Sequence, residues 1–207
     1  MILDSDLDFR YRLRHEAILV HLASEVEDFI SDLVKGLPRI DRVQSRAKSP
    51  ERFVSKALKE EGGKRKYSDP MSEIQDQIGA RIITFYLSDV NSVCTHIEKY
   101  FRHIEKRSVL PESVAEFGYF GFHYIIGMPS DILKESWAET EVPAFFELQI
   151  KTLFQHAWSE ANHDLGYKEL AGNLSADDKR RMAWASAQAW GADQIFDELY
   201  RGGGQAS

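Results

Sequence analysis

Four segments that are dense in β-branched and aromatic residues limit the fold of this chain more than any other feature of its sequence. They are Arg81–Leu87, His103–Val109, Tyr119–Met128 and Ala144–Ile150. Such composition is typical of β-strands. Helical apolar patterns lie before, between and after them, at residues 5–35, 50–59, 89–102, 152–167 and 176–200, with Ser5 or Asp6 as the expected start of the first helix. This order predicts an α+β fold, in which helices flank a mixed β-sheet.

The length of 207 residues predicts one domain, because a chain of this size can bury one substantial core. We expect a single domain over residues 1–207, with its motif-bearing core at about 40–170, helical flanks and a disordered tail at 202–207. No apolar run approaches the roughly 20 residues that cross a bilayer. The single cysteine, Cys94, cannot form an internal disulfide, which favours a cytoplasmic protein.

The last β-rich segment carries two different faces. Period-two alternation places Phe146, Leu148 and Ile150 toward the core, and Glu147, Gln149 and Lys151 on the opposite side. A strand face with a carboxylate, an amide and an ammonium group is expensive to cover unless something polar occupies it. A polar ligand would satisfy that requirement.

A second carboxylate, Asp76, comes just before the first β-rich segment. Asp76 and Glu147 can jointly hold Mg²⁺, which takes a few carboxylate oxygens together with water and substrate phosphates. Taken singly, each acid is more often a surface or salt-bridged residue. Only their juxtaposition would make a metal site.

Two further segments are hard to explain by packing alone. Arg46, Lys48 and Lys56 surround a predicted helix start, where cations oppose the helix dipole and an anionic ligand would relieve the conflict; the alternative is a solvated basic turn. Tyr119 and His123 flank Gly121 on one face of a β-rich segment, leaving room for a base and its phosphates, although a glycine-permitted bend explains them as well.

His156, Glu160 and His163 share one helix face. Their spacing is not that of a zinc protease motif, so a hydrogen-bonded structural cluster is the better interpretation. The sequence contains no Walker loop, Rossmann fingerprint or nucleophile elbow. Any binding of phosphate would therefore depend on side-chain cations.

Taken in order, these segments resemble the synthetase domain of the RelA/SpoT family over residues 40–170. The matching pieces are Arg46-x-Lys48, Asp76-x-x-Gly79-x-Arg81, Gly118-Tyr119-x-x-x-His123, Glu147-x-Gln149-Ile150-x-Thr152, His156-Ala157-Trp158-x-Glu160 and His163-Asp164-x-x-Tyr167-Lys168. The resemblance implies a nucleotidyltransferase-like fold. It also implies a Mg²⁺-dependent pyrophosphokinase that uses ATP and GDP or GTP to make the stringent-response alarmone (p)ppGpp.

The resemblance assigns roles to individual residues. Asp76 and Glu147 would be the catalytic, magnesium-binding pair, with Glu147 also a candidate base for the acceptor 3′-hydroxyl. The ATP phosphates would bind Arg46, Lys48 and Lys56, and the acceptor nucleotide would bind Tyr119, His123, Gln149 and Lys151. Arg52, Ser55 and Gly121 depart from the common family pattern, which leaves the acceptor pocket open to difference.

Two other functions are compatible with the same residues. A toxic small alarmone synthetase relative would pyrophosphorylate tRNA 3′ ends or adenosine nucleotides, but a net charge of −7 disfavours the basic surface that tRNA requires. A degenerate nucleotide-binding regulator would be favoured only if Asp76 and Glu147 fail to meet. Finally, the apolar residues of 176–200 predict packing on the first helix or a homo-oligomer formed through the terminal helices.

Overall fold

The computed structural model describes residues 2–109, 121–167 and 175–203. Its centre is a five-stranded mixed sheet with the order β1-β4-β7-β6-β5. The strands are β1 (Ile40–Ala47), β4 (Ile78–Thr84), β5 (His103–Val109), β6 (Gly121–Gly127) and β7 (Phe145–Thr152). Strands β4 and β7 are parallel, whereas the other neighbouring pairs are antiparallel. The prediction of an α+β fold with a mixed sheet is therefore confirmed.

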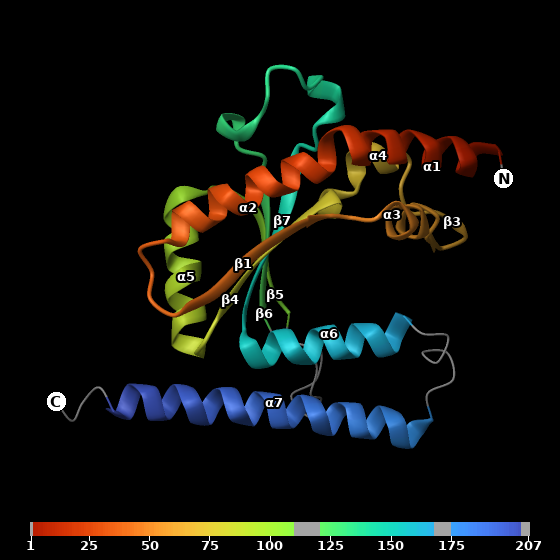
Figure 1. The fold of residues 1–207 in the computed structure, drawn as a ribbon. Helices are drawn as coiled ribbons and strands as arrows, with labels where there is room; N and C mark the ends of the chain where they lie inside the picture. The colour runs from red at the N-terminus through yellow and green to blue at the C-terminus, as the bar shows by residue number, and fades with distance from the viewer. Residues whose placement is uncertain (1, 110–120, 168–174, 204–207) are drawn as a thin grey trace.

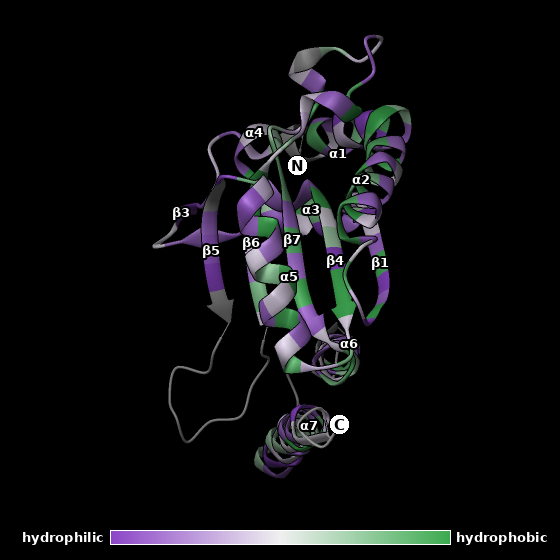
Figure 2. Ribbon diagram, turned by 90° about the vertical axis from the view of Figure 1, so that its left-hand side faces the viewer, coloured by the Kyte–Doolittle hydropathy of each residue, from purple (hydrophilic) through white to green (hydrophobic). Residues whose placement is uncertain are grey.

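Helices α2 (Val20–Val34) and α5 (Leu87–Tyr100) cover one face of the sheet (Figures 1 and 2). Helix α2 continues from α1 (Ile2–Arg14) through a π-helical turn, η1 (His15–Leu19). The core lies between these helices and the sheet. Its fully buried members include Leu22, Val26, Ile30, Ile97, Ile82, Tyr124 and Leu148. Alternation along β7 is as predicted, since Phe146, Leu148 and Ile150 are all buried.

The other face of the sheet is flanked by α3 (Pro50–Ala57) at one end and by α6 (Leu153–Tyr167) at the other (Figure 1). Pro50 takes the first helical position of α3, as its missing N–H favours. A short hairpin of β2 (Glu60–Glu61) and β3 (Lys64–Arg65) follows α3. The helical turns α4 (Pro70–Glu73) and η2 (Gln75–Gln77) lead into β4, and η3 (Ser130–Ile132) and η4 (Glu139–Glu141) connect β6 to β7.

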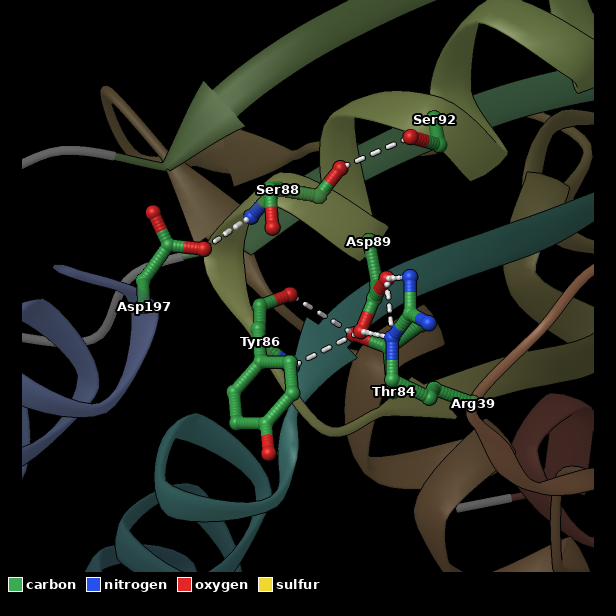
Figure 3. Close-up of polar contacts among 7 residues, drawn as sticks. All are labelled: Arg39, Thr84, Tyr86, Ser88, Asp89, Ser92 and Asp197. Carbon is green, nitrogen blue, oxygen red and sulfur yellow. Dashed lines mark hydrogen bonds and ion pairs between the residues drawn. The ribbon is translucent and has the colours of Figure 1, made fainter. Parts of the chain in front are cut away.

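The C-terminal helix α7 (Ala176–Gly203) lies beside α6, on the side away from the sheet (Figure 1). Its side chains bond to the start of α5 and to the end of β7. The Asp197 carboxylate accepts a 2.8 Å hydrogen bond from the backbone N–H of Ser88, at the start of α5 (Figure 3). Beside it, buried Asp89 accepts 2.7–3.1 Å bonds from the Arg39 guanidinium (Figure 3), and that guanidinium carbon lies 4.4 Å from the centre of the Tyr200 ring.

Several element boundaries differ from the sequence-based expectation. The first helix begins at Ile2, not at Ser5 or Asp6, and α7 continues to Gly203, so residues 202 and 203 of the expected tail are helical. Strand β1 was not predicted. It is an edge strand rich in polar residues, so its composition does not indicate a strand. It is extended because it pairs with β4. Among the described residues, no helix is long and apolar enough to cross a membrane.

Candidate functional site

Polar side chains from all five strands lie on the face of the sheet opposite α2 and α5. The register places Arg46 of β1 beside Gly79 of β4, and Gly79 beside Glu147 of β7. One step along, Gln149 of β7 pairs with His123 of β6. Because side chains alternate along every strand, these neighbours point to the same side. The polar face predicted for β7 is thus continuous with polar positions on the strands around it.

Two pockets open on this face, and they share Asp76 and Glu147. The first has a volume of about 350 Å³, and its charged and amide residues are Arg46, Lys48, Arg52, Asp76, Arg81, Glu147 and Gln149. The second has a volume of about 470 Å³ and is lined by Lys56, Lys59, Lys66, Tyr67, Glu73, Gln75, Asp76, Glu105, Arg107, His123, Ile125 and Glu147. The two carboxylates therefore lie where two cation-rich cavities meet.

Asp76 is positioned by the turn η2, immediately before β4, with backbone angles of φ −94° and ψ 31°. Its Oδ2 atom lies 2.9 Å from the Nζ atoms of both Lys48 and Lys56. Its Oδ1 atom is buried and has no hydrogen-bond partner among the residues that the structure describes. A buried carboxylate oxygen without a donor is costly, so this oxygen is available to a ligand.

Glu147 is kept ionised by its neighbours. Its Oε1 atom lies 3.0 Å from Nδ1 of His123, and its Oε2 atom accepts a 3.0 Å hydrogen bond from Nε2 of Gln149. Burial raises the pKa of Glu147, but the bonds from His123 and Gln149, with the nearby charge of Lys56, outweigh burial and lower it to about 2. The carboxylate is therefore charged at neutral pH.

These two carboxylates fit a hard divalent cation. The described residues hold no group of three or more His, Cys, Asp or Glu side chains able to bind a metal on their own. Mg²⁺ does not need such a cage, because it is commonly bound by one or two carboxylates, waters and substrate phosphates. The free Oδ1 of Asp76 and the ionised Glu147 meet that description.

Of the three helix-face residues, His156 and Glu160 belong to an ionic cluster around Arg81, which also lines the first pocket. Arg81 of β4 lies 2.7 Å from Oε1 of Glu160 and 3.4 Å from Nδ1 of His156. Burial and the Arg81 charge lower the pKa of His156. The cluster borders a third cavity of about 430 Å³, which also contacts Arg46. The contacts of His156 and Glu160 with Arg81 are those of a hydrogen-bonded structural cluster.

The structure does not bring the four predicted acceptor residues together in one pocket. Gln149 lines the first pocket together with Arg46 and Lys48. It does not line the second pocket, where His123 lies. Lys151 lines neither pocket, because α6 covers this end of β7: the residue is 3 % exposed, and its Nζ lies 3.5 Å from Oγ of Ser159. Burial, with repulsion by Arg81, lowers the pKa of Lys151 to about 7. Tyr119 lies outside the described residues.

Sequence reasoning missed several residues that line the second pocket: Lys59, Lys66, Tyr67 and Arg107. The basic loop after Gly62-Gly63 was a signal for Lys66 and Tyr67. Arg107 pairs with His123 across β5 and β6. The two-residue period of a strand, which puts Glu105 and Arg107 on one face of β5, could therefore have placed Arg107 on the same face of the sheet as His123. No periodicity signal in the sequence identified Lys59.

Two cavities that each carry four Lys or Arg side chains and that join at a pair of carboxylates suit the binding of two phosphorylated ligands side by side. The family model described as "Region found in RelA / SpoT proteins" matches residues 45–171. The chain therefore belongs to the RelA/SpoT family. This confirms the resemblance on which the sequence analysis relied.

Known proteins with related sequence or fold agree with this membership. GTP pyrophosphokinase YjbM of Bacillus subtilis (strain 168) is 30% identical over 140 residues, which span 65% of this chain and 63% of that protein. The crystal structure of small alarmone synthetase 1 from Bacillus subtilis aligns with a TM-score of 0.73 and 23% identity, covering 96% of this chain and 97% of that one. A structure of that synthetase bound to its product pppGpp aligns with a TM-score of 0.70 and 24% identity, covering 89% and 92%.

Proposed function

We propose that this chain transfers a pyrophosphate group from ATP to the 3′-hydroxyl of GDP or GTP and so makes the alarmone (p)ppGpp. The observation that carries the proposal is the meeting of two pockets, each lined by four Lys or Arg side chains, at Asp76 and Glu147. One donor and one acceptor nucleotide can occupy the two pockets, with the reacting groups at the junction. The curated relative named a GTP pyrophosphokinase and the fold neighbour bound to pppGpp support the same reaction.

We assign the first pocket to ATP. Arg46, Lys48 and Arg52 line it, and guanidinium and ammonium groups bind phosphate oxygens through charge-assisted hydrogen bonds. Lys56 lines the second pocket, but its Nζ reaches Asp76 at the junction. We therefore assign Lys56 to the transferred group and not to the outer ATP phosphates.

We assign the second pocket to the acceptor nucleotide. His123 and Arg107 lie on adjacent strands, and Lys59 and Lys66 line the same cavity. These groups suit the 5′-phosphates of GDP or GTP. Tyr119 keeps its proposed role as the ring that stacks on guanine. Of the departures from the family pattern, Arg52 adds a cation to the donor pocket, and Gly121 begins β6, the strand that carries His123.

The proposed reaction forms a bond between the acceptor 3′-oxygen and the β-phosphorus of ATP and breaks the bond from that phosphorus to the α–β bridging oxygen, which leaves with AMP. The proton of the 3′-hydroxyl passes to water. Mg²⁺ held by Asp76 and Glu147 would neutralise charge on the transferred phosphates. A carboxylate with a pKa of about 2 is a weak proton acceptor, so we assign Glu147 to metal binding in preference to general base catalysis. Lys48 and Lys56 hold Asp76 in place and point their charges at the same junction.

A labelled-phosphate assay tests the proposal. The chain is incubated with β- or γ-labelled ATP, Mg²⁺ and, separately, GDP, GTP, AMP or deacylated tRNA. We expect label to appear on GDP or GTP, and to be lost in Asp76→Asn with the fold retained by circular dichroism. Label on AMP or tRNA instead would identify a toxic synthetase relative, and binding of ATP without any transfer would identify a regulator.

We also propose that residues 1–207 act as one synthetase domain in the cytoplasm. The flanking helices support this, because α1 packs on α3 of the matched region through Tyr11 and Phe53, whose ring centres are 3.7 Å apart. At the other end, Asp193 of α7 bonds to Thr152 of β7 at 2.7 Å. A reduced Cys94, which is buried, is consistent with the compartment.

A further inference from the structure

Helix α1 lies outside the region matched by the family model, which begins at residue 45. Two of its side chains nevertheless reach the segments that carry Lys48 and Asp76. They are Tyr11, which is fully buried, and Arg14, which is 5 % exposed. Three positions apart on a helix, the two side chains share one face. The proposed reaction assigns no role to either.

Tyr11 holds the backbone of Lys48. Its hydroxyl donates a 2.9 Å hydrogen bond to the carbonyl oxygen of Lys48. On the other side of the same residue, the N–H of Lys48 donates a 2.8 Å bond to the carbonyl of Gln77. The Tyr11 ring stacks on Phe53, with ring planes 6° apart. Lys48 is therefore fixed between α1 and the residue that follows Asp76.

Arg14 holds the segment that ends at Asp76. Its Nη1 atom donates to Oε1 of Gln77 and to the carbonyl of Met71, both at 3.1 Å. The Gln77 amide in turn donates 2.9 Å bonds to the carbonyls of Met71 and Ile74. Gln77 is 1 % exposed, so these bonds are shielded from water and close residues 71–77 into a fixed loop. Asp76 lies in this loop, next to Gln77.

The same arginine also reaches the approach to β7. Its Nε atom donates a 2.6 Å bond to the carbonyl of Glu141, in the turn just before the strand that carries Glu147. One guanidinium thus joins the segments before both carboxylates. A lysine has a single ammonium group and lacks the planar fork that makes these divergent bonds.

The π-helical turn η1 directly follows Arg14. From Leu19 onward, Leu19, Leu22 and Val26 pack in the core, to which the Tyr11 ring also belongs. Before the turn, the polar groups of Tyr11 and Arg14 bond to the loops of the site. Such turns contain one more residue than an α-helical turn and are often found near functional sites. Here the turn lies between the part of the helix that bonds to the loops of the site and the part that packs in the core.

We infer that Tyr11 and Arg14 are positioning residues for the proposed reaction: Tyr11 sets Lys48, and Arg14 sets Asp76 through Gln77. The inference rests on the proposed function for its catalytic consequence. Its structural part concerns only the chain's own contacts. Two conservative variants test it, Tyr11→Phe, which removes one hydroxyl, and Arg14→Lys, which keeps the charge.

The chain offers a matched control for each variant. Arg12→Gln removes an arginine of the same helix that also bridges to α3, through Glu51 at 2.9 Å, but on the exposed surface. Tyr124→Phe removes the hydroxyl of another fully buried tyrosine, which bonds to Glu98 of α5 at 2.7 Å. A general loss of packing or stability would affect the controls as well.

The first measurement is steady-state transfer from ATP to GDP at several Mg²⁺ concentrations. We expect Arg14→Lys to lower kcat about 10- to 100-fold, because loss of a residue that positions a metal ligand has an effect of this size. The Mg²⁺ concentration that gives the half-maximal rate should rise, and the KM for GDP should change less than about threefold. Tyr11→Phe should lower kcat about 3- to 10-fold, in line with one buried hydrogen bond. Both controls should keep the wild-type kcat.

The second measurement is hydrogen–deuterium exchange without nucleotide, which is independent of activity. Arg14→Lys should speed exchange in residues 71–78, and Tyr11→Phe should speed it at Lys48, with no such change in the controls. Unchanged exchange, or faster exchange with wild-type kcat and Mg²⁺ dependence, overturns the inference. A wild-type chain that transfers nothing would overturn the proposed function instead, and the exchange data would still decide whether α1 holds the two segments.

Discussion

Replacing Asp193 with asparagine should stabilise the fold at neutral pH, and should do so less in acid. Asp193 of α7 is 3 % exposed. Its Oδ2 atom accepts a 2.7 Å bond from the Thr152 hydroxyl, and its Oδ1 atom has no partner among the described residues. Burial raises its pKa from 3.8 to about 6; the Thr152 bond opposes this, and the nearby Asp197 charge adds to it.

The sign follows from proton binding. The folded state binds this proton more tightly than the unfolded state, so the contribution of Asp193 to stability is present below pH 3.8 and is lost as pH rises through about 6. A difference of about 2 pKa units corresponds to about 3 kcal/mol at pH 7.5, and to about 1 kcal/mol at pH 4.5. Asparagine keeps an oxygen for Thr152 but has no charge. Its own burial reduces the gain, by the same amount at both pH values.

Urea denaturation of wild type and Asp193→Asn at the two pH values measures the effect. We expect a gain in unfolding free energy of about 1–3 kcal/mol at pH 7.5, and a gain about 2 kcal/mol smaller at pH 4.5. Asp177→Asn is the control, because Asp177 lies on the same helix in an exposed pair with Arg181 and should change stability by less than about 0.5 kcal/mol. An equal effect of Asp193→Asn at both pH values would refute the reasoning.

Three further predictions concern the site and the terminal helix. Tyr119→Ala should weaken use of GDP or GTP about 5- to 150-fold, the range for loss of base stacking, and leave the KM for ATP nearly unchanged; equal losses for both nucleotides would reject the stacking role. Glu147→Gln should abolish the Mg²⁺ dependence of ATP binding measured by calorimetry, because the amide is a poor Mg²⁺ ligand; an undiminished Mg²⁺ effect would remove Glu147 from the metal site. Trp190, 45 % exposed on α7, should contribute to a homo-oligomer, so light scattering should show a multimer that Trp190→Glu dissociates, whereas a wild-type monomer at micromolar concentration would contradict the oligomer.

The sequence predicted the chemistry of β7 better than its surroundings. Alternation correctly placed Glu147 and Gln149 on the polar face, because the period of a strand depends only on its backbone. It also placed Lys151 there, but α6 folds back over the end of the strand and buries that residue. Which part of a polar face remains open depends on the path of the next helix, and local pattern does not contain that information.

Contacts between distant segments were the least predictable. Strand β1 has few β-branched residues, yet pairing with β4 fixes it and places Arg46 in the first pocket. The bonds of Tyr11 and Arg14 join residues 37 to 127 positions apart, and nothing in the helical pattern of α1 distinguishes a residue that faces a loop from one that faces the core.

The sequence placed Lys56 among cations that surround the start of α3, and this placement was wrong. Lys56 does not oppose the dipole of α3, because it lies in the last turn, where cations are favoured. The conflict is in the first pocket, where Arg46, Lys48, Arg52 and Arg81 face only two carboxylates, Asp76 and Glu147.

Four cations against two carboxylates leave a surplus of two positive charges in the first pocket, within a chain whose net charge is −7. Glu160, whose Oε1 atom lies 2.7 Å from Arg81, offsets one of these charges, and burial, with repulsion by Arg81 and Arg52, lowers the pKa of Arg46. We therefore expect an anionic ligand to bind in this pocket. A polyphosphate suits this pocket best, because its negative charges are spread over linked phosphates that can contact several separated cations at once. Local charge, and not the net charge of the chain, decides which ligand this surface attracts.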